Sequence, residues 1–187
     1  DHAAKAVERL DGMFAFVISD GSELFAARDT VGIKPLYVAH HGDQIAFASE
    51  LKAFSGDFAR TVREFPPGTC YHTATGLRRF RTIENGEVTD LSVEEHCSRL
   101  RTSLDRAVSK RLMSDVPLGA FLSGGLDSSI IAALAKRHVD ELHTFSVGLD
   151  GSPDLEAARL VAKHLGTVHH EYVFTREEVF DILPEVV

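Results

Sequence analysis

The sequence predicts an α+β unit followed by an α/β unit: first an antiparallel β layer, and then a parallel sheet whose strands alternate with helices. Short strands joined by tight turns fill the chain from residue 10 to residue 82. From residue 92 onward, helical stripes alternate with apolar runs, which is typical of right-handed βαβ units. A glycine-containing turn at 123–129 lies where parallel sheets bind their ligands.

The first unit, residues 1–85, is assigned from its hairpin signals. The apolar run 13–18 predicts a strand buried on both faces, and Asp20-Gly21 predicts a turn into a strand over 23–28. Two more hairpins and a short helical turn complete the antiparallel layer: 36–40 with 44–48, 69–73 with 77–82, and the turn 51–54.

The second unit, residues 92–187, follows a polar, turn-forming linker at 83–91. Ser92 and Glu95 form a Ser-x-x-Glu capping box, which predicts a helix. Its apolar stripe has six members: Val93, Cys97, Leu100, Leu104, Val108 and Leu112. Strands and helices then alternate as follows: a buried strand 116–122, a helix from 126, a strand 142–149, a helix 153–165, a strand 168–174 and a helix from 176.

Composition and charge argue against several classes of protein. The chain has 187 residues, 44% of them hydrophobic, which is enough for a substantial core. A net charge of −8, without a run of Lys or Arg, argues against a nucleic-acid surface. No apolar run approaches the roughly 20 residues that span a bilayer. The two cysteines show neither metal-ligand nor disulfide spacing, so we expect a cytoplasmic protein without a membrane partner.

The turn at 123–129 combines several features that favour an anion. Gly124 and Gly125 remove side-chain bulk where the backbone turns, so backbone N–H groups can approach a ligand closely. Ser128 and Ser129 follow in the first helical turn, where free amides, two hydroxyls and the positive end of the helix dipole converge. Phosphate groups bind well at a helix N-terminus of this kind. The alternative is an ordinary glycine–serine turn between a strand and a helix.

An acidic residue and a missing lysine distinguish this turn from the usual P-loop. A Walker P-loop needs a Lys for the β- and γ-phosphates, and no Lys occurs between Lys110 and Lys136. Asp127 instead places a carboxylate inside the anion site, which is favourable mainly when a divalent cation lies between it and the phosphates. Residues 123–129, Ser-Gly-Gly-Leu-Asp-Ser-Ser, resemble the pyrophosphate-loop signature of ATP pyrophosphatase-type synthetases.

A second stretch of interest, residues 27–37, lies in the first unit and contains Arg28 and Asp29. Taken alone, it is a strand end followed by a Gly/Pro turn, with a solvated ion pair that has no further role. However, it resembles the Arg-Asp-x-x-Gly-x-x-Pro-Leu-Tyr segment of class II glutamine amidotransferase domains, which are Ntn-type folds. Three more segments match that family in the expected order: 10–16, 48–53 and 65–68.

Together, the two signatures resemble the glutamine-hydrolysing asparagine synthetases over essentially the whole chain, with further matches at 148–155 and 165–171. The resemblance implies a C–N ligase in which one domain hydrolyses glutamine to release ammonia. The other domain would activate aspartate as its adenylate, which the ammonia attacks to give asparagine, AMP and pyrophosphate. The implied ligands are aspartate, glutamine, ATP and Mg²⁺, and a homodimer is a further expectation.

The resemblance also assigns roles by position. Asp29 would bind the α-amino group of glutamine, and Asp127 would hold Mg²⁺. The backbones of Leu122 and Val147 would meet the adenosine part of the nucleotide. The residues that would cradle the pyrophosphate are Ser123, Gly124, Gly125, Leu126, Asp127, Ser128 and Ser129. No side chain within the chain is assigned as catalytic.

Two departures from the family pattern concern residues that the chain lacks. The family's nucleophile is a Cys at the mature amino terminus, and an upstream Arg and Asn-Gly pair contact glutamine and the oxyanion. None of these has a counterpart here, and the family's later Ser-Gly-Glu-Gly-x-Asp-Glu loop is also missing. We therefore expect an internal fragment that is inactive alone. Cys70 and Cys97 are expected to be inert core thiols.

Other readings of the sequence stay open. A related synthetase could use the same two domains on another carboxylate, as β-lactam synthetases do, or the chain could be a catalytically inactive nucleotide-binding module. A metal held by His40 and His41, or by His169 and His170, is not expected. Adjacent residues of a strand point to opposite faces, so neither pair could chelate one ion.

Overall fold

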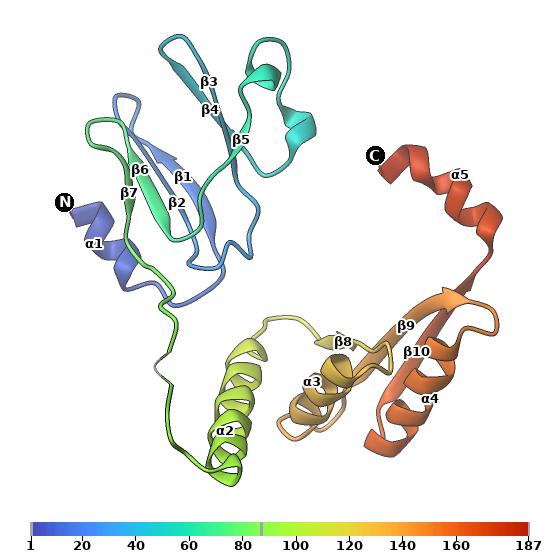
Figure 1. The fold of residues 1–187 in the computed structure, drawn as a ribbon. Coiled ribbons are helices and arrows are strands. Elements are labelled where there is room, and N and C mark those ends of the chain that lie inside the picture. Colours follow the sequence, from blue (N-terminus) through green and yellow to red (C-terminus); the bar gives the residue numbers. More distant parts are fainter. Residues whose placement is uncertain (1, 87, 187) are drawn as a thin grey trace. The chain divides into compact units, whose positions relative to one another are not determined.

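The computed structural model describes residues 2–86 and 88–186, which form two compact units, 1–88 and 89–187 (Figure 1). Glu87, in the predicted linker, and Val187, in the last predicted helix, lie outside the described residues. The first unit contains antiparallel sheets and the second a parallel sheet. The predicted combination of antiparallel and parallel α/β architecture is therefore present.

Unit 1 contains two antiparallel sheets, one with the strand order β1-β2-β6-β7 and one with the order β4-β3-β5. The three predicted hairpins and the predicted helical turn are all confirmed. The elements of the unit are α1 (His2–Glu8), β1 (Ala15–Ser19), β2 (Leu24–Arg28), β3 (Tyr37–His41), β4 (Gln44–Ala48), η1 (Leu51–Ala53), η2 (Phe58–Arg60), β5 (Arg63–Glu64), β6 (Thr69–His72) and β7 (Gly76–Arg79).

The turn between β1 and β2 shows why its sequence signal was reliable. The Asp20 carboxylate accepts hydrogen bonds from the backbone N–H groups of Glu23 at 2.8 Å and Ser22 at 2.9 Å. These bonds, led by the one from Glu23, lower the pKa of Asp20 to about 2. The turn is therefore specified by contacts within four residues of each other.

The prediction that 13–18 is buried on both faces is wrong. β1 lies at the edge of its sheet, next to β2. Val17 is 40% exposed and Ile18 is 60% exposed. An apolar run therefore predicted the strand correctly, but its burial depends on neighbours that local sequence does not specify.

Arg28 is buried at the end of β2 and does not form the solvated ion pair with Asp29 that the sequence also allowed. Only 5% of its surface is exposed. Its guanidinium donates to four acceptors at 2.7–2.9 Å, namely a Glu64 carboxylate oxygen and the backbone carbonyls of Gly32, Lys34 and Phe65. The side chain therefore holds two separate loops together by their backbones.

Asp29 is buried in the same region and binds different backbone groups. It is 1% exposed, and its carboxylate accepts four backbone N–H bonds at 2.9–3.2 Å, from Phe14, Val31, Ile33 and Lys34. Burial raises the pKa of this carboxyl, but the four amide bonds together outweigh it and leave the pKa below its usual value. Asp29 therefore ties the start of β1 to the turn that follows β2.

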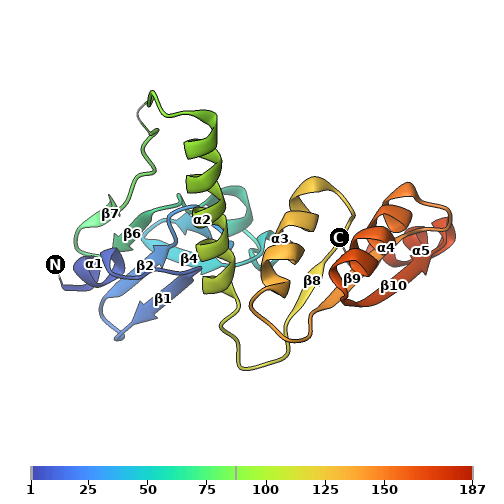
Figure 2. The same cartoon turned by 90° about the horizontal axis from the view of Figure 1, so that it is seen from below.

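Unit 2 is built on a parallel sheet with the strand order β10-β9-β8. α3 and α4 contact each other, and α4 packs on β9 and β10, so one face of the sheet is covered (Figure 2). The elements are α2 (Val93–Arg111), β8 (Gly119–Phe121), α3 (Leu126–Lys136), β9 (His143–Leu149), α4 (Pro153–Leu165), β10 (Val168–Phe174) and α5 (Arg176–Val186). No described helix is long and apolar enough to cross a bilayer.

The predicted helix ends in unit 2 are confirmed by their caps. Ser92 and Glu95 form the reciprocal capping box, with N···O distances of 2.9 and 3.3 Å. The hydrogen bonds from Ser92 also lower the pKa of Glu95. Gly166 ends α4 in the left-handed conformation, with φ of 64°. These short-range signals predicted the element boundaries well.

Two predictions of burial in unit 2 are wrong. β8 was expected to be a buried strand, but it lies at the sheet edge, and Phe121 is 84% exposed. Cys97 was expected in the core, but it is exposed. Only the last part of the α2 stripe packs into the core, where Val108 is 7% exposed, whereas Leu100 is 60% exposed.

Cys70, by contrast, is buried as expected. Its side chain packs with Val7 and Ala27, and burial raises the pKa of the Cys70 thiol. A neutral buried thiol is a poor nucleophile, so Cys70 is a structural residue.

Asp29→Asn tests whether the buried carboxylate stabilises unit 1. The amide NH₂ group cannot accept hydrogen bonds, so one pair of backbone N–H donors loses its acceptor. We expect the free energy of unfolding to fall by about 3 kcal/mol, measured by denaturant titration of the full chain. Asp43→Asn, an exposed change in the turn between β3 and β4, is the matched control and should have little effect.

The same variant gives a pH test with a defined sign. Because the folded-state pKa of Asp29 is lowered, its stabilising contribution is complete above the ordinary value of 3.8 and is lost as the pH falls through the folded-state pKa. Wild type should therefore lose more stability than Asp29→Asn on acidification below that value. Parallel stability curves for the two proteins would contradict this account.

Candidate functional site

The strand–turn–helix segment 119–129 lies at the carboxyl edge of the parallel sheet. Leu122, 1% exposed, is held on both sides of its peptide unit by β9. Its N–H donates to the carbonyl of Phe145 at 2.8 Å, and its own carbonyl accepts a hydrogen bond from the hydroxyl of Ser146. Leu122, the residue just before the turn, is therefore fixed in position by β9.

Gly124 is required for packing of the turn against α4. Its φ of +76° is in the left-handed region, and a Cβ at this position would lie 2.5 Å from both Ala157 Cβ and the backbone nitrogen of Ala158. The space saved by this glycine is thus filled by α4, whereas the sequence suggested that it would admit a ligand. Gly125 differs, because its φ is −69° and a Cβ would be 3.4 Å from the Ser123 hydroxyl.

Two of the three serines of the turn converge. The hydroxyl oxygens of Ser123 and Ser128 are 3.0 Å apart, and the Ser123 N–H donates to the Ser128 hydroxyl at 3.3 Å. The Ser128 and Ser129 hydroxyls both donate to the Gly125 carbonyl, at 3.2 and 2.7 Å. These two hydroxyls therefore meet at one backbone acceptor at the start of α3, and their contact with an anion stays a prediction.

The first turn of α3 presents backbone donors next to these hydroxyls. The helical hydrogen bonding begins with the N–H of Ser129, which donates to Gly125 at 3.1 Å. The N–H groups of Leu126, Asp127 and Ser128 precede it and have no acceptor within the helix. Together with the dipole of α3, they make this end of the helix attractive to an anion.

A small hollow of about 130 Å³ opens beside the turn. It brings together Leu122, Ser123 and Val147, because the parallel pairing of β8 with β9 places the ends of both strands at one edge. Its complete lining is Phe121, Leu122, Ser123, Phe145, Ser146, Val147, Asp154 and Leu155.

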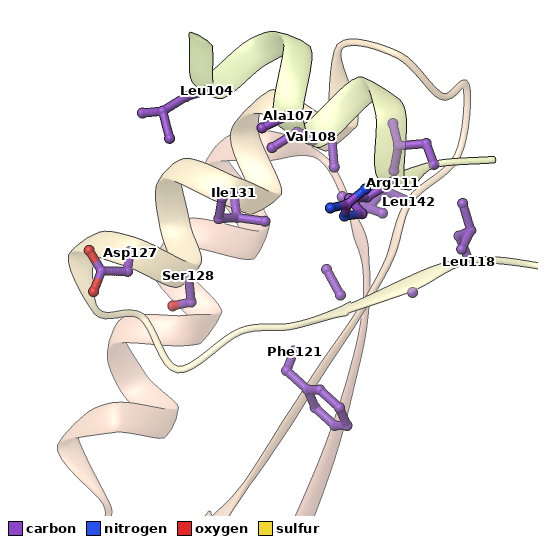
Figure 3. Close-up of a pocket in the computed structure, with 14 residues that line it drawn as sticks. Leu104, Ala107, Val108, Arg111, Leu118, Phe121, Asp127, Ser128, Ile131 and Leu142 are labelled. Carbon is purple, nitrogen blue, oxygen red and sulfur yellow. The ribbon is translucent and has the colours of Figure 1, made fainter. Parts of the chain in front are cut away.

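A larger cavity of about 530 Å³ lies on the other side of the turn, between α2, β8 and α3 (Figure 3). Asp127 and Ser128 lie at one end of it on the first turn of α3, and Arg111 of α2 also lines it. Five of the predicted nucleotide-site residues therefore divide between these two cavities. The other four line neither of them, namely Gly124, Gly125, Leu126 and Ser129.

Asp29 has no open site around it. Its carboxylate is closed off from solvent, and its acceptor positions are used by four backbone amides. This geometry gives Asp29 a structural task, and its contact with the α-amino group of glutamine stays a prediction.

Sequence reasoning missed two residues of the site. Ser146 fixes the carbonyl of Leu122, and Asp154 lines the small hollow from the first turn of α4. Ser146 did carry a signal, because it is a hydroxyl residue on the face of β9 that packs under the helices. Asp154 was seen only as a favourable acid at a helix start.

No group of three or more His, Cys, Asp or Glu residues within 2–86 and 88–186 is placed to hold a metal ion. His169 and His170 have different partners, as strand alternation requires. His169 Nδ1 lies 2.9 Å from the Thr144 hydroxyl, and His170 Nε2 lies 2.8 Å from His143 Nδ1.

The geometry defines unit 2 as a parallel α/β unit whose strand–turn–helix lies at the edge where such sheets bind ligands. Comparison with family models finds a match in each unit. Residues 99–187 match the model described as asparagine synthase, and residues 1–56 match the model described as glutamine amidotransferase domain. The two matched segments follow each other in the order that the motifs predicted.

Curated relatives match the whole chain. Asparagine synthetase [glutamine-hydrolyzing] of Zea mays is 46% identical over 201 residues, and the second such enzyme of Arabidopsis thaliana is 44% identical over 203 residues. The chain spans 34% and 35% of the lengths of these relatives. A solved glutamine phosphoribosylpyrophosphate amidotransferase from B. subtilis is a weaker match, at 19% identity and a TM-score of 0.37 over 95% of this chain and 38% of that one.

Alanine substitution of the two glycines tests whether Gly124, and not Gly125, is required for packing. Gly124→Ala should lower the free energy of unfolding by at least about 3 kcal/mol, because a positive φ and an overlap with α4 both penalise the methyl group. Gly125→Ala should cost less than about 1 kcal/mol, since its backbone suits alanine and its Cβ has room. Denaturant titration measures both. Equal losses would contradict the packing role of Gly124.

Proposed function

We propose that this chain is part of a glutamine-dependent asparagine synthetase. The observation that carries the proposal is the strand–turn–helix at 122–129, with its paired serines and open amides, within a segment of the asparagine synthase family. The amidotransferase-like segment that precedes it supports glutamine as the nitrogen donor. The proposed domains are 1–85, part of the amidotransferase, and 92–187, part of the synthetase.

The proposed reaction has two stages. Aspartate displaces pyrophosphate from ATP and becomes an acyl adenylate, and ammonia released from glutamine then displaces AMP to give asparagine. The synthetase unit needs no nucleophilic side chain for this, because its contribution is to orient the nucleotide and stabilise the departing pyrophosphate.

The residues of the turn have distinct parts in this proposal. The open N–H groups of the α3 first turn and the hydroxyls of Ser123 and Ser128 would bind the pyrophosphate oxygens. The ligand would replace the hydrogen bond between these two hydroxyls. The backbones at Leu122 and Val147, which share the small hollow, would contact the adenosine part.

Asp127 is the residue proposed to hold Mg²⁺. It is exposed in the first turn of α3, and no described ion pair engages its carboxylate. Mg²⁺ in nucleotide sites is commonly bound by one or two carboxylates together with phosphate oxygens, so a single acid beside a phosphate site fits it. The ion would neutralise charge on the leaving pyrophosphate. Cytoplasmic localisation and a homodimer stay predictions.

Asp127→Ala tests the metal role. We expect the dissociation constant for ATP in excess Mg²⁺ to rise at least tenfold, or about 1.4 kcal/mol, as measured by calorimetric titration of the chain. In EDTA, the dissociation constants of Asp127→Ala and of wild type for ATP should differ little, because the carboxylate contacts the nucleotide through the cation. Asp181→Ala, a remote acid on α5, is the control. Unchanged affinity in Asp127→Ala would refute the assignment.

Aspartate-dependent exchange of labelled pyrophosphate into ATP tests the substrate in the full-length protein. Exchange with aspartate, and not with other carboxylic acids, is the expected result. Exchange that requires a different carboxylate would assign a related synthetase, and absence of any exchange despite nucleotide binding would indicate an inactive binding module.

A further inference from the structure

We propose that Asp154 recognises the ribose of the bound nucleotide, accepting hydrogen bonds from its hydroxyls and selecting ribonucleotides over 2′-deoxyribonucleotides. This inference rests on the proposed function, because it names the group that reads the sugar of the same nucleotide.

Asp154 lies across the small hollow from the start of the phosphate-binding turn. It is the second residue of α4, and it lines the hollow together with Ser123 and Val147. The three residues come from the turn, β9 and α4. Asp154 thus brings a carboxylate to the hollow that the turn and β9 share.

The backbone at Asp154 is held in place. Pro153 occupies the first helical position, where its ring restricts φ. Leu155 is 2% exposed and packs against β9 at Gly148, where a Cβ would lie 3.1 Å from Leu155 Cγ. Further along α4, Arg159 binds Glu171 of β10 through two hydrogen bonds of 2.6 and 2.8 Å. The helix therefore holds Asp154 at a defined distance from the turn.

The size of the hollow restricts which part of the nucleotide can reach Asp154. At about 130 Å³ it is smaller than the roughly 300–1,000 Å³ of pockets that enclose whole ligands. With the phosphates on the amides of the α3 first turn, the part next along the nucleotide is the ribose. Ser123, which lines the hollow and begins the turn, marks the junction between the two.

The chemistry of a carboxylate also favours the ribose. An ionised carboxylate only accepts hydrogen bonds, and the 2′ and 3′ hydroxyls are adjacent donors that it can engage together. An acid contacts the ribose 2′-hydroxyl in the same way in dinucleotide-binding folds. Asp127, the residue proposed to hold the cation, lines the larger cavity, whereas Asp154 lines the small hollow, so the two acids are assigned different parts of the nucleotide.

Calorimetric titration with ATP and with 2′-deoxy-ATP, both in excess Mg²⁺, tests the inference. Wild type should bind ATP roughly tenfold more tightly, since a hydrogen bond to a charged group is at stake. Asp154→Ala should lose this preference, because ATP binding weakens more than 2′-deoxy-ATP binding, which loses only the contact with the 3′ hydroxyl. Asp154→Asn, which keeps the shape, should lose most of it. Glu156→Gln, a neighbouring exposed acid outside the hollow, should keep it.

The possible failures are distinguishable. Equal wild-type affinity for the two nucleotides would overturn the ribose contact while leaving nucleotide binding intact. Equal weakening of both nucleotides in Asp154→Ala, with an unchanged melting temperature, would also overturn it and would indicate a cation ligand. Absence of binding of either nucleotide to wild type would overturn the proposed function together with this inference.

Discussion

The structure of the second unit depends on the close contact between the backbone of Gly124 and the early part of α4. A side chain at this position would occupy the space of Ala157 and Ala158, so the turn and the helix can meet only through a glycine. Leu122 is held from the other side by β9. The beginning of α3, and with it the direction of its open amides, follows from these two contacts. An anion site of this kind needs no Lys or Arg side chain, because its donors are backbone N–H groups that the fold has already oriented.

The first unit uses buried charges for a comparable purpose. Arg28 and Asp29 are neighbours in sequence, yet they do not neutralise each other. Both bind backbone groups of the turn after β2, Arg28 through carbonyls and Asp29 through N–H groups, and Arg28 also binds Glu64 and Phe65. Isolated charges in a protein interior are costly, and this cost is offset only because every polar contact is made in one arrangement of the loops. The sequence motif that resembles a functional signature therefore also holds turns together in this part of the chain.

Local signals predicted much of the fold. The capping box at Ser92, the Asp20-Gly21 turn and the Gly166 helix end each depend on residues a few positions apart, and each is present. Burial was predicted less well. Ile18 and Phe121 are apolar residues in correctly predicted strands, but they are exposed because β1 and β8 lie at sheet edges. Cys97 is exposed although it lies on the apolar stripe of α2.

The candidate site also combines features that local sequence predicts with features that it does not. The turn and its helix follow from spacing, whereas the partners of Gly124 and Ser146 could not be predicted, because both make their decisive contacts far along the chain. Ser129 differs from these two residues. Its contact is local, but spacing alone does not say whether a hydroxyl in a first helical turn faces the ligand or its own backbone.

The central claim is that the amides and hydroxyls of the turn from Ser123 to Ser129 bind the phosphates of a nucleotide. A crystal structure of the chain with a non-hydrolysable ATP analogue and Mg²⁺ tests this most directly. The account predicts phosphate oxygens within hydrogen-bonding distance of the backbone nitrogens at the start of α3 and of the Ser123 and Ser128 hydroxyls. A nucleotide bound elsewhere, with this turn unchanged and without ligand, would contradict it.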